Sequence, residues 1–150
     1  MGNFTATARI LIHRPASEVY EAFADPDTMT KFWFPKASGR LETGKDVKWY
    51  VGTGDDAPEI IVRVKLAEKP KTIHIEWGDG DKFTDVTWEF ESKGDEGTIV
   101  RITESGFTGS ESEIMDNVLD STGGFNQVVV AVKALLEHDV RLNIVKDHCV

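Results

Sequence analysis

The central part of the chain, from Ser38 to Ser105, alternates between short patterned segments and turns. Apolar residues recur in those segments at every second position, which is the period of a β-strand with one buried face. The turns are short and rich in Gly, Asp, Lys and Pro, so neighbouring strands should pair as antiparallel hairpins. The expected strands are 39–42, 46–51, 59–67, 72–77, 83–91 and 98–104, and a similar alternating segment at 4–13 adds one more.

Two short helices are expected directly after the first strand. The first begins at residues 15–17, where Pro, Ala and Ser follow one another. The second begins with Asp25 as its cap and Pro26 as its first residue, because Pro is tolerated at that position and fixes a helical φ angle. It is expected to end in the aromatic cluster at 32–34.

The longest helix is expected near the C-terminus, beginning at the Gly123–Gly124 pair. Before it, residues 107–122 are interpreted as a loop with a helical turn near 114–119. One apolar stripe at helical spacing supports the long helix. The members of that stripe are Phe125, Val128, Val129, Val132, Leu135 and Leu136.

These elements predict an α+β fold in which a curved antiparallel sheet of about seven strands grips one long helix. One helix cannot cover every strand closely, so the curled sheet can leave a hollow between itself and the helix. The side chains expected to line this hollow are Phe32, Trp33, Trp49, Val64, Ile75, Trp77, Val86, Trp88, Phe90, Ile102, Glu104, Phe125, Val128, Val129 and Val132. The alternative is that the same side chains form a packed core without a ligand.

Length, charge and cysteine content limit the partners and the location. The 150 residues are expected to form one domain, 1–150, around one core. The net charge of -9 makes nucleic acid an unfavourable partner, because a phosphate backbone repels such a surface. No apolar run suits a membrane span or a signal peptide, so no membrane insertion is expected. Cys149 is the only cysteine, so a reducing, cytoplasmic location is expected.

The polar residues show no pattern typical of a catalytic or metal site. His13, His74, His138 and His148 are far apart in the sequence and lack metal-ligand spacing, so neither a metal nor a cofactor is expected. No Gly-x-Ser-x-Gly nucleophile motif is present. Glu104 stands out because its carboxylate falls on an otherwise apolar strand face, where burial is costly without a partner. It is either a polar anchor of the hollow or a strand end that emerges into solvent.

Four segments carry a resemblance to a known family: 15–26 with its Asp-Pro break, the aromatic run at 31–35, the hairpin and exit at 87–107, and the closing helix at 123–138. Their order resembles the helix-grip superfamily of START-like and Bet v 1-like domains. Within it, the chain is similar to the family related to the C-terminal domain of the activator of the Hsp90 ATPase. The resemblance implies a sheet wrapped around the C-terminal helix, with two short helices after the first strand.

Two positions depart from the pattern of that family. Phe125 stands where the closing helix commonly has Trp, and Asp139 stands where a Gly often ends it. The helix is therefore expected to run past His138. The family shares no strict catalytic motif, so the resemblance implies no catalytic residue.

Three functions are compatible with this sequence. The leading interpretation is a carrier or sensor that binds a small hydrophobic or aromatic molecule between sheet and helix, acting as a monomer or weak homodimer. The second is a cyclase-like or hydratase-like enzyme for a polyketide-like substrate, as in some relatives with this fold, with Glu104 as general base. No second acid–base group is evident on the same face, so an enzyme is the less favoured interpretation. The third is a chaperone-linked interaction module, as the family name suggests.

Overall fold

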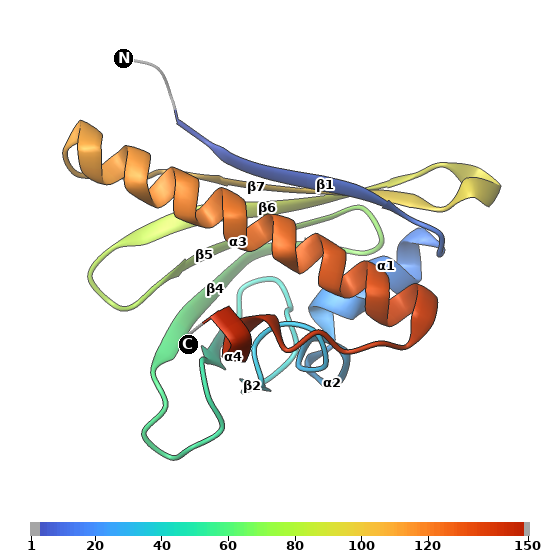
Figure 1. Cartoon of the computed structure of the whole chain (residues 1–150), viewed down its shortest axis with the longest axis horizontal. Coiled ribbons are helices and arrows are strands. Elements are labelled where there is room, and N and C mark those ends of the chain that lie inside the picture. The colour runs from blue at the N-terminus through green and yellow to red at the C-terminus, as the bar shows by residue number, and fades with distance from the viewer. Residues whose placement is uncertain (1–3, 149–150) are drawn as a thin grey trace.

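The fold is built on a single antiparallel sheet of seven strands (Figure 1), in a computed structural model that describes residues 4–148. Consecutive strands pair from β2 to β7, and β1 pairs with β7, which gives the order β1-β7-β6-β5-β4-β3-β2. The expected sheet is therefore confirmed, while Cys149 lies outside the described residues. The strands are β1 (Ala6–Ile12), β2 (Lys36–Ala37), β3 (Asp46–Tyr50), β4 (Glu59–Glu68), β5 (Thr72–Gly78), β6 (Phe83–Ser92) and β7 (Thr98–Ser105).

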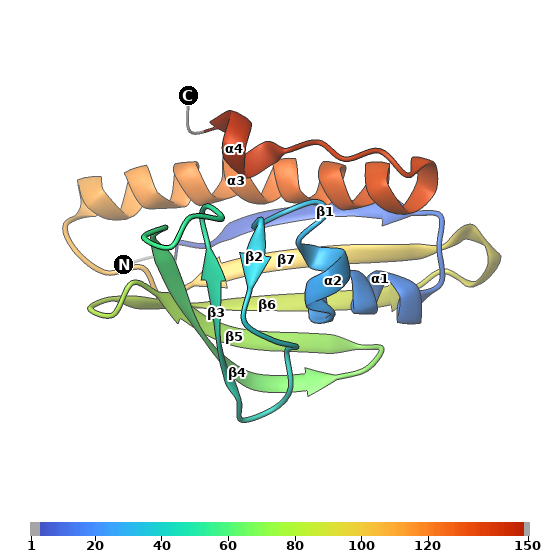
Figure 2. The same ribbon diagram turned by 90° about the horizontal axis from the view of Figure 1, so that it is seen from below.

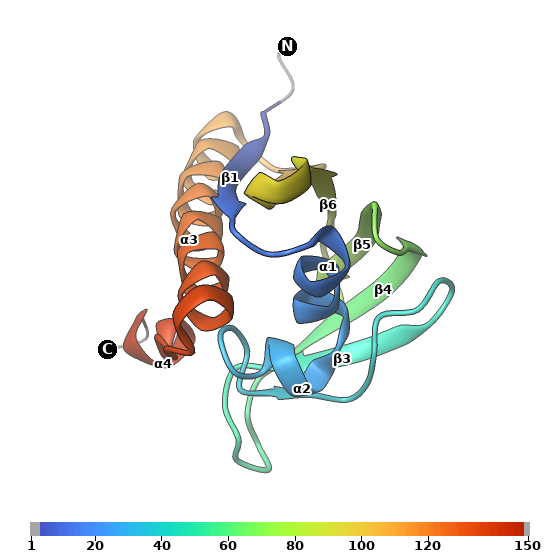
Figure 3. The same ribbon diagram turned by 90° about the vertical axis from the view of Figure 1, so that its right-hand side faces the viewer.

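The sheet curves around one side of the long helix α3 (Glu111–His138), as Figure 3 shows. In β4 the pairing register shifts between Val64 and Leu66, and a bulge of this kind bends its strand. The backbone of α3 lies chiefly along β1, at the edge of the sheet (Figures 1 and 2). The central strands therefore need a second cover, which comes from the chain that follows β1.

The two short helices expected after the first strand are present as α1 (Ala16–Ala24) and α2 (Pro26–Met29). Asp25 caps α2 as expected, because its side chain accepts a hydrogen bond from the Asp27 N–H at 3.0 Å. Aromatic rings from this region fill the space beneath the sheet. The Phe23 ring centroid lies 5.2 Å from that of Phe32 and 5.8 Å from that of Trp88.

The prediction of a strand at 39–42 is wrong. The short strand is β2, where residues 36–37 pair with 49–50 of β3. Beyond it, the N–H of Leu41 donates to the carbonyl of Ala24 at 3.1 Å, at the end of α1. Because this N–H is committed to a helix end, the segment does not extend the strand ladder.

The long helix α3 begins well before the Gly123–Gly124 pair, so the loop expected at 107–122 is wrong. Ser110 and Glu113 form a capping box, in which the Ser110 hydroxyl accepts from the Glu113 N–H at 3.1 Å and the Glu113 carboxylate accepts from the Ser110 N–H at 3.3 Å. The helix then continues through both glycines. Its buried residues begin only at Phe125, so the buried stripe gives no signal for the first half.

The end of α3 also differs from the expectation that it runs further. The helix stops at His138 because Asp139 adopts a left-handed conformation, with φ of 54°. The Asp139 N–H bonds back to the carbonyl groups of Ala134 and Leu135, which closes the last turn. Asp tolerates this conformation better than most side chains do. The chain then turns back and forms the short helix α4 (Ile144–His148) beside α3.

The apolar stripe of α3 faces the sheet, as the sequence predicts. Its members Phe125, Val128, Val129, Val132 and Leu135 are buried, and Leu136 is partly buried against the core. In contrast, Val130 is 49% exposed on the opposite side of the helix. None of the helices within residues 4–148 combines the length and the hydropathy that a membrane span requires.

Candidate functional site

A pocket of about 300 Å³ opens beside the first buried turn of α3, between that helix, α4 and the ends of β3 and β5. Figure 2 shows α4 lying against α3. The pocket brings together residues from five separate parts of the chain. They are Trp33, Phe34, Val51, Trp77, Asp120, Ser121, Gly124, Phe125, Gln127, Val128, Ile144, Val145 and His148.

Four aromatic rings form one wall of this pocket. The rings of Trp77, at the end of β5, and Phe125, on α3, stack with centroids 5.7 Å apart and an interplanar angle of 22°. Trp33 lies 5.9 Å from Trp77 and 4.9 Å from Phe34, so the segment after α2 completes the wall. Contacts of this kind are favourable beyond simple burial, so they hold the wall in place without a ligand.

Four of the residues that the sequence predicts for a hollow line this pocket: Trp33, Trp77, Phe125 and Val128. Most of the others lie in the core, each at most 6% exposed: Phe32, Trp49, Val64, Ile75, Val86, Trp88, Phe90, Ile102, Val129 and Val132. Aromatic rings occupy the space between them; Trp33, for example, lies 5.0 Å from Trp49 and 6.1 Å from Trp88. The pocket is thus displaced from the centre of the sheet toward α4.

Glu104 is buried, at 3% exposed, and does not emerge into solvent at the end of its strand. Its Oε2 accepts a hydrogen bond from the indole N–H of Trp77 at 2.9 Å and another from the hydroxyl of Thr84. Its Oε1 has no partner within the described residues, and neither has the buried indole N–H of Trp88. Glu104 does not line the pocket, but it fixes the orientation of Trp77, which does.

The sequence interpretation missed the polar side of the pocket. Asp120, Ser121 and Gly124 belong to the part of α3 that was expected to be a loop or the helix start, and their spacing puts them on the face of Phe125 and Val128. The signal that finds them is the capping box, Ser-x-x-Glu at 110–113. With the helix start placed there, these residues extend the face of Phe125 and Val128 toward the start of α3, although they are not themselves buried.

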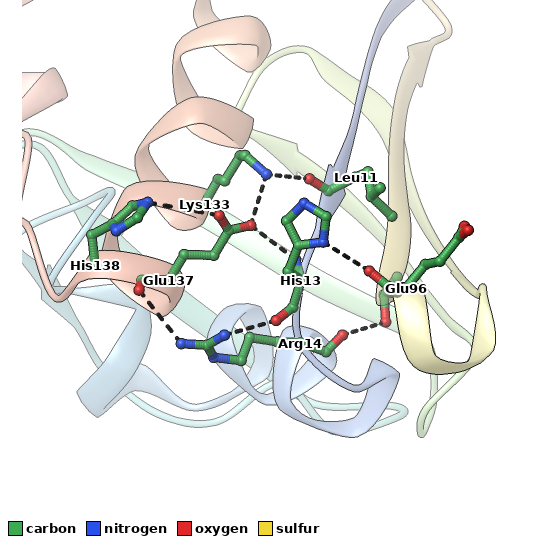
Figure 4. A network of polar contacts seen from close by, with 8 residues as sticks. Leu11, His13, Arg14, Glu96, Lys133, Glu137 and His138 are labelled. Carbon is green, nitrogen blue, oxygen red and sulfur yellow. Dashed lines mark hydrogen bonds and ion pairs between the residues drawn. The ribbon is translucent and has the colours of Figure 1, made fainter.

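A second group of titratable side chains lies at the other end of α3 (Figure 4). Glu137, whose side chain is only 10% exposed, accepts from the His13 N–H at 2.8 Å and from Lys133 Nζ at 2.7 Å. Lys133 also donates to the carbonyl of Leu11 at 2.6 Å, and His13 Nδ1 donates to the carbonyl of Glu96 at 2.9 Å. These bonds join the end of α3 to β1 and to the turn before β7, so the group is a structural clamp.

This clamp makes the stability of the fold depend on pH in the acidic range. Burial by itself raises the pKa of the Glu137 carboxyl, but hydrogen bonds from Lys133 and from the His13 N–H outweigh it and lower that pKa below its usual 4.5. Because this pKa is lower in the folded protein than in the unfolded chain, the ionised carboxylate stabilises the fold above about pH 4.5, and this stabilisation is lost as the pH falls. We expect Glu137→Gln to cost about 1 kcal/mol at pH 7 and to flatten the acid limb of a stability–pH profile from urea denaturation.

Glu89→Gln is the control for that profile, because Glu89 is exposed on β6 and takes part in none of these bonds. It removes the same charge and should leave both the stability at pH 7 and the acid limb close to those of the parent protein. An acid limb that stays equally steep in Glu137→Gln would show that the clamp does not carry the effect.

Among residues 4–148, no group of three or more His, Cys, Asp or Glu side chains is placed to hold a metal ion. The titratable side chains that line the pocket are Asp120 and His148.

Comparisons with known proteins agree with this architecture. Residues 13–137 match the family model described as Activator of Hsp90 ATPase homolog 1-like protein. Among solved structures, the protein SSP2350 from Staphylococcus saprophyticus is 26% identical, with a TM-score of 0.77 over 92% of this chain and 95% of that one. No curated protein matches the sequence.

Two more distant structures share the fold. DynU16, a putative protein in the dynemicin biosynthetic locus, is 22% identical with a TM-score of 0.77, over 92% of this chain but only 49% of its own. PFC0360w, an HSP90 activator from Plasmodium falciparum, is 17% identical with a TM-score of 0.68, over 89% of this chain and 96% of its own. The family match spans most of the chain, and the helix-grip architecture agrees with it. The chain therefore belongs to the Activator of Hsp90 ATPase homolog 1-like family.

Proposed function

We propose that the protein binds a small, mainly apolar molecule in the pocket between α3, α4 and the aromatic wall. The observation that carries this proposal is the wall itself: rings from the segment after α2, from β5 and from α3 converge on about 300 Å³ of open space. A pocket of this volume lies at the lower end of small-molecule sites, which are mostly apolar with a few polar groups. Asp120, Ser121 and Gln127 supply such polar groups here.

The size of the pocket sets the expected affinity. Burying roughly 300 Å² of apolar ligand surface at about 25 cal/mol per Å² is favourable by roughly 7 kcal/mol. Association itself costs several kcal/mol of lost translational and rotational freedom, so an apolar ligand without matched polar contacts should bind with a Kd in the high micromolar to millimolar range.

Gly124 offers a direct test, because it lines the pocket and a Cβ added there meets nothing within 4 Å. The side chain of Gly124→Leu should extend into the open space and weaken binding of the uncharged fluorescent probe N-phenyl-1-naphthylamine by about tenfold or more. Because a Gly in a helix is unfavourable, the same variant should be more stable than the parent by about 0.5–1 kcal/mol. Probe titrations and urea denaturation measure the two effects.

Gly123→Leu is the matched control. Gly123 is the preceding residue of α3, is likewise exposed with nothing within 4 Å of an added Cβ, and does not line the pocket. It should gain similar stability and bind the probe like the parent protein. Equal binding by the parent and both variants would place the probe elsewhere and contradict the proposal.

A chaperone-linked role is the second candidate, favoured by the family description and by the similarity to an HSP90 activator. It predicts that the protein raises the ATPase rate of a purified Hsp90 from the same source. A rise that is the same for the parent and for Gly124→Leu would assign that activity to a surface other than the pocket. The enzymatic alternative has less support, because Glu104 does not line the pocket.

A further inference from the structure

We propose that the pocket selects cationic ligands: an aromatic or aliphatic body that carries a protonated amine. This inference rests on the proposed function and adds the charge of the ligand to it. The charged side chains that line the pocket support it. Asp120 supplies a carboxylate, and no Lys or Arg is among the described residues that line the pocket. His148 is the other titratable side chain there.

The carboxylate of Asp120 is available for a ligand. Asp120 is exposed on α3, and none of the ion pairs within residues 4–148 involves it. An ammonium group at the mouth of the pocket can therefore pair with Asp120 without displacing a lysine or an arginine. The net charge of -9 for the whole chain also attracts cations and repels anions.

The aromatic wall also favours a positively charged ligand. A cation placed over the face of Trp, Tyr or Phe is attracted by the negative face of the ring. The lining includes four aromatic rings, from Trp33, Phe34, Trp77 and Phe125, and the stacked pair Trp77–Phe125 covers one face of each of its own rings. An amine that reaches past Asp120 thus continues to meet favourable surfaces.

An anionic ligand meets the opposite situation. Its carboxylate would face Asp120 and would find no ammonium or guanidinium group in the lining. The indole N–H of Trp77, a natural donor to an anion, already donates to Glu104 Oε2 at 2.9 Å. Ser121, Gln127 and His148 could replace part of the hydration of an anion, but the charge of Asp120 opposes it, so burying an anion there is costly. This disfavours fatty acids and other carboxylates relative to amines of the same size.

Three ligands with one common body test the inference: 1-naphthylmethylamine, 1-naphthalenemethanol and 1-naphthaleneacetate. They share the naphthalene ring and carry a positive, a neutral and a negative group. By calorimetric titration at pH 7 and low salt, we expect the amine to bind about fivefold more tightly than the alcohol, as one partly exposed ion pair with a cation–π contact permits. The acetate should bind more weakly than the alcohol.

Asp120→Asn should remove the charge preference, so that the amine and the alcohol bind this variant with about equal affinity. Asp116→Asn is the matched control, since Asp116 lies one turn earlier on α3, is exposed and does not line the pocket. It removes the same charge from the same helix, so it should retain the preference for the amine and thereby exclude a general effect of net charge.

The outcomes separate the inference from the proposed function. If the alcohol binds, is blocked by Gly124→Leu, and matches the amine, the pocket binds ligands but the charge preference is wrong. Tighter binding of the acetate, or an amine preference that Asp120→Asn retains, also overturns the inference. If none of the three binds, both the inference and the proposed function fail.

Discussion

Val132→Asp should remove a large part of the stability of the protein. Val132 is 0% exposed in the middle of the α3 stripe that faces the sheet. A carboxylate there loses its hydration in an apolar environment, or must bind a proton to avoid that loss. The expected cost of about 4 kcal/mol or more is a large share of the 5–15 kcal/mol that stabilises an ordinary domain. Circular dichroism during thermal and urea denaturation measures it.

Val130→Asp is the matched control, because it makes the same change two residues earlier on the same helix. Val130 is 49% exposed, so its new carboxylate stays hydrated and should change stability by only about 0.5 kcal/mol. Similar melting temperatures for the two variants would mean that the side of α3 facing the sheet has been assigned incorrectly.

Gly97→Ala should have the second largest effect. Gly97 precedes β7 and has φ of 124°, a conformation that an L side chain rarely adopts. In addition, a Cβ at this position would overlap the carbonyl oxygen of Ile12 and lie 2.9 Å from the Cα of His13. Both are backbone atoms at the end of β1, so relief requires the strand pair to shift. We expect a loss of about 3 kcal/mol or more in urea denaturation.

Gly80→Ala separates backbone strain from this overlap. Gly80 has nearly the same φ, 122°, but an added Cβ there meets nothing within 4 Å. It should therefore cost only the strain of the left-handed conformation, about 1–2 kcal/mol. If Gly97→Ala were no more costly than Gly80→Ala, the close approach of Gly97 to the end of β1 would not be a source of destabilisation.

The sheet could be predicted from the sequence because its signal is local. Strands with apolar residues at every second position, separated by short turns, leave little choice of partner, and the five strands from β3 to β7 lie close to their expected bounds. The short strand was misplaced because a two-residue strand has no period to detect. The start of α3 was misplaced because Gly123 and Gly124 look like a helix boundary, whereas the real signal is the capping box at Ser110.

The site was harder to predict because inward orientation does not distinguish a packed side chain from a pocket wall. Trp49 and Trp77 both point inward from neighbouring parts of the sheet, yet Trp49 is 1% exposed in the core and Trp77 lines the pocket. The difference depends on which rings from α1 and the segment after α2 reach each strand. It also depends on α4, whose Ile144 and Val145 lie against the pocket although nothing in the strand pattern indicates their position.

The glycine pair in α3 has a consequence for hydrogen exchange. Each glycine weakens a helix by about 1 kcal/mol relative to Ala, and here the pair separates a second half that contains every buried residue of α3 from a first half that contains none. Backbone amides before Gly123 should therefore exchange through local opening, and those after Phe125 only through global unfolding. Asp120 and Ser121 lie in the first half, so one wall of the pocket belongs to the less protected unit. A ligand held by that wall would slow exchange mainly there, and part of its binding free energy would be spent on ordering the helix.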